Sequence, residues 1–196
     1  MTSQKIAIGF VAVALFVGVV TAHAADFDAG FKAYQRGDFA TALRIFRQLA
    51  EQGDASAQYN LGFMYDNGQG VSQDYAESMR WYSKAAYQGE SSAQYNLGVM
   101  FFKGQGVTQN YAEAMKRFRI AADQGHVLAQ TGLGLIYDLG RGVTQDYVQA
   151  HMWYNIAAAQ GQKDAGKWRD SLAEKMTPEQ IAEAQTLARY WKPKRM

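Results

Sequence analysis

Carboxylates are the side chains in this sequence whose chemistry could be catalytic. Asp66, Asp74, Glu77 and Asp138 could in principle supply the acid and the base of a hydrolytic pair. Asp74 and Glu77, however, stand at the spacing of a helix-capping box, and equivalent residues recur later in the chain. A catalytic constellation is usually singular, so this recurrence favours a structural role.

Histidine and cysteine offer little further chemistry. The chain has no cysteine, and of its three histidines only His126 and His151 lie beyond the first 24 residues. A metal site needs three or four converging ligands, which these two residues cannot supply. The sequence therefore predicts no metal site and no cofactor. His151 takes the place of Met79 and Met115 in earlier segments, which predicts a packed histidine in a methionine position.

The elements that must position these residues are repeats. The stretch AQYNLGFMYDNGQGV at residues 57–71 returns as AQYNLGVMFFKGQGV at 93–107 and as AQTGLGLIYDLGRGV at 129–143, with a period of 36 residues. Such a period is typical of a solenoid of two-helix units. The Gly-X-Gly pairs lack the preceding strand of a phosphate-binding loop, so we interpret them as turn glycines at positive φ.

Each unit is predicted to hold two helices. In the first helix, which should begin near Ala57, the residues Ala57, Leu61 and Tyr65 share one face and are predicted core positions. Glycines at 62, 98 and 134 cost about 1 kcal/mol of helix propensity, which suggests a close approach of another helix. The second helix should start at a capping box in three units: Asp74 with Glu77, Asn110 with Glu113, and Asp146 with Gln149.

The N-terminal residues have the pattern of a secretory signal. Lys5 precedes an apolar run from Ile6 to Val20, and small residues end at Ala24. The run is shorter than the 20 or so residues of a spanning helix, so we expect cleavage after Ala24 and no stable membrane insertion afterwards. A protein exported without cysteines would be soluble and periplasmic or secreted, and stabilised by packing alone.

Self-similarity divides the chain into six parts. Residues 163–196 lie beyond the repeat and predict two capping helices, the second marked by Thr177, Pro178 and Gln180, with Trp168 among the apolar residues of the first. The parts are a signal peptide at 1–24, an atypical repeat at 25–54, full repeats at 55–90, 91–126 and 127–162, and the capping helices with a basic tail at 163–196.

The net charge of +2 is spread along the chain, and the only basic cluster is the tail at Lys192, Lys194 and Arg195. A nucleic-acid partner would be expected to meet a basic face, so we expect none. We interpret the tail as a solvated end.

The pattern AxxxLGxxYxxGxGVxxDYxxAxxWYxxAAxxG, matched at residues 57–89 except that Ser78 replaces one alanine, resembles the Sel-one-like repeat, which is related to the tetratricopeptide repeat. The resemblance is close over 55–162 and loose over 27–54. It implies an all-α, right-handed solenoid of antiparallel helix pairs that binds other proteins. Departures are few: Arg117 replaces the tryptophan of Trp81 and Trp153, and Phe101 replaces the tyrosine.

The concave wall of such a solenoid would be formed by the first helices, on the side away from the core. Counting 100° per residue from Leu61 gives the candidate contact residues. They are Tyr59, Phe63, Asp66 and Asn67, then Tyr95, Val99, Phe102 and Lys103, then Thr131, Leu135 and Asp138. Two interpretations of Phe63, Val99 and Leu135 stay open: the floor of a peptide groove, or packing between first helices.

We therefore expect a noncatalytic periplasmic adaptor or regulator whose partner is another protein or peptide, such as the periplasmic domain of an envelope or membrane protein. The alternative is a binder of peptidoglycan peptides or β-lactam-like ligands, because some relatives with this repeat are described in that way. Hydrolysis is disfavoured, since S-x-x-K, S-D-N, K-T-G and zinc-binding histidines are all missing from the sequence.

Overall fold

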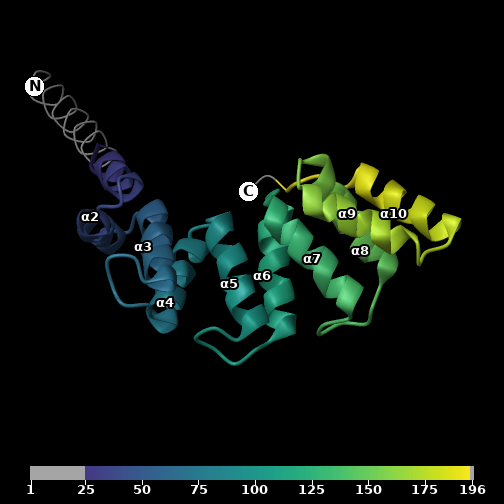
Figure 1. Ribbon diagram of the computed structural model, residues 1–196, viewed down its shortest axis with the longest axis horizontal. Helices are drawn as coiled ribbons and strands as arrows, with labels where there is room; N and C mark the ends of the chain where they lie inside the picture. The colour runs from purple at the N-terminus through teal and green to yellow at the C-terminus, as the bar shows by residue number, and fades with distance from the viewer. Residues whose placement is uncertain (1–24, 195–196) are drawn as a thin grey trace, which may run out of the picture. The chain divides into compact units, whose positions relative to one another are not determined.

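The computed structural model describes residues 25–194, which form helices and no strands (Figure 1). The predicted signal peptide, its cleavage after Ala24, and Arg195 lie outside these residues. The chain divides into two compact units, with the boundary between Ser78 and Met79. This boundary falls inside the helix α4 (Tyr75–Tyr87).

The first unit contains helical residues 25–35, then α2 (Phe39–Glu51) and α3 (Ala55–Asn67). α2 and α3 pack against each other. Carboxylates begin both helices, since Asp38 accepts a hydrogen bond from the Thr41 N–H at 3.1 Å and Asp54 accepts one from the Ala57 N–H at 2.6 Å. The helix predicted near Ala57 therefore starts two residues earlier, directly after its cap.

The second unit continues from α4 with three helix pairs. Neighbouring helices from α5 to α9 pack on one another, and α10 packs on α8, so the last pair covers the final repeat. The all-α repeat solenoid predicted from the sequence is thereby confirmed. The pairs are α5 (Ser91–Lys103) with α6 (Tyr111–Asp123), α7 (Val127–Leu139) with α8 (Tyr147–Ala159), and α9 (Lys163–Ala173) with α10 (Pro178–Tyr190).

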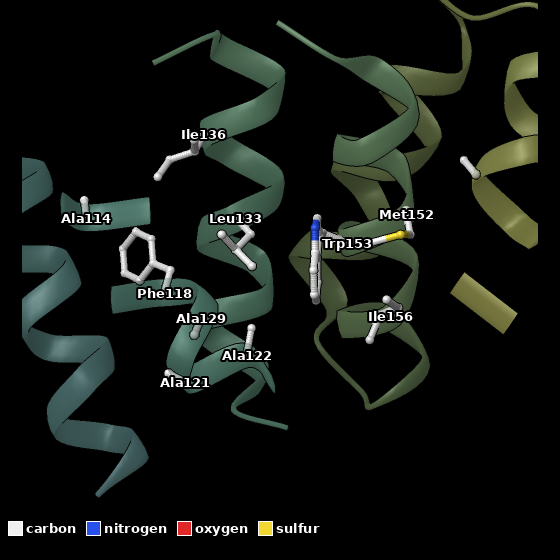
Figure 2. Close-up of a cluster of buried hydrophobic side chains, with 11 residues drawn as sticks. Ala114, Phe118, Ala121, Ala122, Ala129, Leu133, Ile136, Met152, Trp153 and Ile156 are labelled. Atoms are coloured by element: carbon white, nitrogen blue, oxygen red, sulfur yellow. The ribbon is translucent and has the colours of Figure 1, made fainter. Parts of the chain in front are cut away.

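A cluster of buried side chains joins α6, α7 and α8 in the second unit (Figure 2). Trp153 is fully buried in this cluster, together with Leu133 and Phe118. The Arg119 guanidinium lies over the Trp153 ring at 4.8 Å, and the Trp191 ring meets it edge-on at 5.7 Å. The position of Trp153 is therefore a packing centre of this unit.

The helical glycines mark close contacts between helices, as the sequence predicted. A Cβ on Gly98 would lie 2.5 Å from the Phe118 ring, and one on Gly134 would lie 2.5 Å from the Tyr154 ring. Both rings belong to the second helix of the same repeat. The helix-propensity cost of glycine is thus offset by the packing of a buried aromatic ring.

Gly134 and Gly166 make a matched pair for testing this packing. Gly134→Ala should lower the free energy of unfolding, because an overpacking cost of about 1–3 kcal/mol outweighs a propensity gain of about 1 kcal/mol. Gly166→Ala should raise it by up to about 1 kcal/mol, since its Cβ would lie 3.7 Å from that of Ala158. Urea denaturation measures both, and a shift of the same sign in both variants would contradict the explanation.

Tyr65 is not a core residue, contrary to the prediction from its spacing. Ala57 and Leu61 are fully buried as predicted, but the third core position of the face is taken by Met64, which is also fully buried. Tyr65 is half-buried at the edge of the face, where its hydroxyl accepts a hydrogen bond from Arg47 at 2.8 Å. A tyrosine needs a partner for its hydroxyl, and the edge of the face provides one.

The second helices use half of the predicted capping box. The side chains of Asp74, Asn110 and Asp146 each accept a hydrogen bond from the backbone three residues ahead, at 3.0, 3.0 and 2.9 Å. Their own N–H groups donate to carbonyl oxygens at the end of the preceding helix, which belong to Tyr65, Phe101 and Tyr137. The turn already satisfies these donors, so the acidic partner is not needed for them.

The turn explains this geometry. Gly68 and Gly70 have φ values of 66° and 69°, so both predicted turn glycines adopt the left-handed conformation. At the last helix the complete capping box predicted from Thr177 and Gln180 is present.

Residues 191–194, the last that the structure describes, contact the second unit. Trp191 packs on Trp153, and Lys194 forms an ion pair with Asp123 at 2.7 Å. The backbone N–H of Lys194 also donates to the Asp123 carbonyl oxygen. Lys194 is exposed, as expected of a solvated tail, but it is tied to Asp123 by these two contacts.

Candidate functional site

In the first unit, the predicted contact residues lie along α3. Tyr59 and Phe63 are half-buried, with ring centroids 6.5 Å apart. The Asn67 amide donates to the Phe63 carbonyl oxygen at 2.8 Å, and the Asp66 carbonyl oxygen accepts a hydrogen bond from Gln73. The polar groups of Asn67 and Gln73 are thus used within the unit, where they support the end of α3 and the following turn.

In the second unit, the structure brings six of the predicted residues together around one hollow of about 300 Å³, which we call the Leu128 hollow. They come from the facing sides of α5 and α7. The predicted residues in its lining are Tyr95, Val99, Phe102, Lys103, Thr131 and Leu135, and the others are Phe118, Leu128, Gly132, Gln162, Asp164 and Trp168.

The predicted residue Asp138 lies outside this hollow. It lines a neighbouring space of about 270 Å³, the Lys175 hollow, between α7, α8 and α9. The Tyr154 hydroxyl donates to the Asp138 carboxylate at 3.5 Å. Burial, and then the nearby Asp138 charge, raise the pKa of Tyr154 well above its ordinary value. Leu135 and Trp168 line both hollows, so the two spaces are neighbours on one surface.

Trp168 is the main residue of this surface that sequence reasoning misplaced. It was expected on the apolar side of α9, yet its side chain is 44% exposed and its ring stands 5.7 Å from that of Tyr154. Trp168 stands 36 residues after Gly132, which also lines the hollow, but that position is not among the contact residues counted from Leu61. Core positions of α9 are instead Ala165 and Leu172.

Leu128 is a second residue of this surface that sequence reasoning missed. It lies in the first turn of α7, 44% exposed, one residue before the buried Ala129. Leu128 and Trp168 are two large apolar side chains exposed at the border of a single space. Exposed apolar side chains that gather in this way are typical of interaction surfaces.

The floor of the hollow is tied to the core. Val99 and Phe102 are half-buried and pack against the buried cluster of α6 to α8, while one side of each lines the hollow. Of the three residues whose role was left open, Val99 thus both packs against the core and lines the hollow. Their role in binding stays a prediction.

Tyr95 forms one wall of the hollow within a stack of rings. Its ring centroid lies 4.8 Å from that of His126 and 5.7 Å from that of Phe118. Burial raises the pKa of Tyr95 above its usual range. The tyrosine is held from two sides, so it presents a preformed surface to a ligand.

His126 caps α7 with an acceptor that exists only when the imidazole is neutral. Its Nδ1 accepts a hydrogen bond from the Ala129 N–H at 3.3 Å, where the equivalent positions of α3 and α5 hold Asp54 and Glu90. Burial lowers the pKa of His126, and the Glu90 charge opposes that shift. A helix N-terminus also disfavours a positive charge.

The His126 cap predicts a loss of stability in mild acid. Below the unfolded pKa of about 6.5, the unfolded chain takes up a proton that the folded chain resists, so stability falls by at most about 1.4 kcal/mol per pH unit. Above that pH, His126 is neutral in both the folded and the unfolded chain, so its cap contributes fully to stability. His126→Asp gives α7 the aspartate cap that α3 has, and it should reduce this loss of stability between about pH 6.5 and 5. Urea midpoints across that range measure the effect.

The control for this prediction is His151→Met, because His151 is buried as predicted and burial also lowers its pKa. Its Nδ1 has no hydrogen-bond partner among residues 25–194, and Met79 and Met115 at the equivalent positions are only half-buried, so this is not a core methionine position. If His126→Asp has the same pH profile as the original protein, the assigned cap is wrong.

The described residues hold no group of three or more His, Asp and Glu side chains arranged to bind a metal ion. Among those same residues, no helix is both long and apolar enough to cross a bilayer. Of the carboxylates that could have formed an acid and base pair, Asp74 caps α4 and Asp138 accepts from Tyr154.

The sequence model of the Sel1 repeat matches this chain four times in succession, at residues 24–54, 55–90, 91–126 and 127–162. No curated protein matches the chain. Solved structures do, and the similarity to the first two extends over most of the present chain.

One similar structure is a Sel1 repeat protein from Oxalobacter formigenes, with 31% identity, a TM-score of 0.73, and coverage of 85% of this chain and 72% of that one. Another is c5321, a protective antigen present in uropathogenic Escherichia coli strains displaying an SLR fold, with 29% identity and a TM-score of 0.60. That alignment covers 85% of this chain but 44% of c5321, so this chain spans less than half of it. A putative Sel1 repeat protein from Klebsiella pneumoniae, at 17% identity and a TM-score of 0.51, shares the fold, with 77% of each chain covered.

Proposed function

Because this chain belongs to the Sel1 repeat family, whose members are typically noncatalytic and act as protein-interaction adaptors, we propose that it holds a segment of a partner protein in the Leu128 hollow. The observation that carries the proposal is the exposure of Leu128 and Trp168 at the border of one apolar space. A surface tryptophan beside a preformed hollow is a common anchor of protein interfaces.

The hollow has the properties expected of a peptide-binding surface. Its volume of about 300 Å³ lies at the small end of ligand sites, which fits a side chain or two of a partner segment. Four helices, α5, α6, α7 and α9, supply its walls, and the packing of neighbouring helices from α5 to α9 fixes the walls in place. A rigid surface loses little entropy on binding.

We infer the cellular location of the protein from its N-terminal segment. The basic start, short apolar run and small residues of 1–24 support export, so we place the mature adaptor in the periplasm, with an envelope protein or the periplasmic domain of a membrane protein as its partner. Release by osmotic shock, with an intact mass that corresponds to a chain starting at Ala25, is the expected result. Full-length protein in the cytoplasmic fraction would contradict this placement.

Site-specific photocrosslinking in the producing cell tests the binding surface. A benzophenone amino acid placed at Leu128 should give a discrete crosslinked adduct with a partner protein, because this side chain borders the hollow and is exposed. The matched control is the same amino acid at Tyr190, which is 75% exposed on α10 and outside the hollow.

The adduct at position 128 should disappear when Trp168→Ala is added. An adduct of equal intensity at position 190, or one at 128 that survives Trp168→Ala, would place the partner on another surface. A crosslink to a small cell-wall fragment instead of a protein would support the alternative ligand class. Mass spectrometry of the adduct separates these outcomes.

A further inference from the structure

The Leu128 hollow is lined by two side chains of opposite charge, of which only the negative one is paired. Lys103 and Asp164 are the two charged side chains in its lining. Asp164 forms an ion pair with Lys167 at 3.0 Å, whereas Lys103 has no hydrogen bond or ion pair among the described residues. Lys103 is exposed, so its ammonium group is available to a ligand.

The lysine is particular to this repeat. It is the last residue of α5, and the equivalent last residues of α3 and α7 are Asn67 and Leu139. A cation at a helix C-terminus is mildly stabilising, but those two helices end at the same glycine turn without one. The charge is therefore not required by the repeat, and it stands where α5 borders the hollow.

The remainder of the lining is largely apolar. Val99 and Phe102 lie beside Lys103 on α5, and Leu135 and Trp168 line the same space from α7 and α9. A ligand that fills this space must therefore bring a bulky apolar group, and a carboxylate close to that group would meet the lysine.

We propose that the partner segment held in the Leu128 hollow carries a bulky apolar side chain next to an acidic residue, the apolar side chain filling the hollow and the carboxylate pairing with Lys103. This inference rests on the proposed adaptor function and adds the chemistry of its partner. The apolar contact supplies most of the affinity, and the exposed ion pair selects among apolar segments by charge.

Selection of random linear peptides displayed on phage tests this chemistry, with the purified protein as bait and Lys103→Glu as the matched second bait. The first bait should enrich peptides with Phe, Trp, Leu or Met within a few positions of Asp or Glu. The second should enrich the same apolar residues next to Lys or Arg. Because Lys103 is exposed, the variant should retain the fold, which circular dichroism checks.

Synthetic versions of the selected peptides complete the test. Lys103→Met should weaken binding of the acidic peptide by up to about fivefold at low salt, the scale of an exposed ion pair, and should remove its salt dependence. Trp168→Ala should weaken every peptide, whatever its charge.

The outcomes separate the two proposals. Peptides that require Trp168 but show the same charge preference with both baits would overturn the role of Lys103 and leave the adaptor function intact. Peptides that bind equally well to Trp168→Ala would overturn both, because the hollow would not be their site. Absence of enrichment over an unrelated helical bait would also count against both.

Discussion

Replacing Trp153 with alanine is expected to lower the free energy of unfolding by about 3–5 kcal/mol, the usual cost of removing a large buried aromatic side chain. The side chain is fully buried, and its loss would leave a cavity between α6, α7 and α8. It would also remove the contacts that hold Arg119 and Trp191. In a solenoid each repeat is stabilised by its neighbours, so the damage should spread through the second unit.

Trp168→Ala is the matched control, because it removes the same side chain from an exposed position. It should change the free energy of unfolding by about 1 kcal/mol or less, since the ring is 44% exposed and makes one described ring contact, with Tyr154. Urea denaturation followed by circular dichroism compares the two. Equal losses in the two variants would show that Trp153 is not the packing centre described above.

The second large effect is expected on binding. Trp168→Ala should weaken the complex with the crosslinked partner by at least about 30-fold, the scale of an interface hot spot. The ring borders both hollows, so its removal opens the wall between them. Isothermal titration with the purified partner measures the loss.

Two variants make that result specific. Trp168→Phe should retain most of the affinity, because an aromatic wall remains. Tyr190→Ala should bind as the original protein does, since this exposed residue lies outside the hollow. A loss of affinity shared by Tyr190→Ala would indicate a general defect or a different surface.

The fold could be predicted from the sequence because the repeat states the same information several times. Leu61, Leu97 and Leu133 are buried in register, and the turn glycines adopt positive φ wherever the motif places them. The helical glycines could be interpreted in the same way, because an unfavourable residue that recurs must be offset by packing. Family resemblance supplied the function class, which no single residue indicated.

Other features could not be predicted because they depend on distances between helices. Spacing alone could not separate Tyr65 from Met64, which are adjacent in sequence and both near the core face. The N–H of Asp74 is satisfied by a carbonyl oxygen across the turn, and a capping-box pattern carries no information about that turn. Such errors arise wherever a neighbouring helix or turn supplies the contact that the local sequence pattern assigns to another residue.

The candidate site could be predicted only in part. Counting residues around the first helix found Tyr95, Val99 and Leu135, since the periodicity of a helix is fixed. The count covered only the three recognised repeats, and Trp168 was predicted only as one of the apolar residues of the helix that follows them. Trp168 stands 36 residues after Gly132, which was not among the counted contact residues, so the register alone could not place it beside the hollow.

A crystal structure of the protein in complex with its crosslinked partner would locate the binding surface directly. We expect a segment of the partner in the Leu128 hollow, with an apolar side chain between Val99, Leu135 and Trp168 and a carboxylate near Lys103. A partner bound to the opposite helices α6 and α8, with the hollow free of protein, would contradict this expectation.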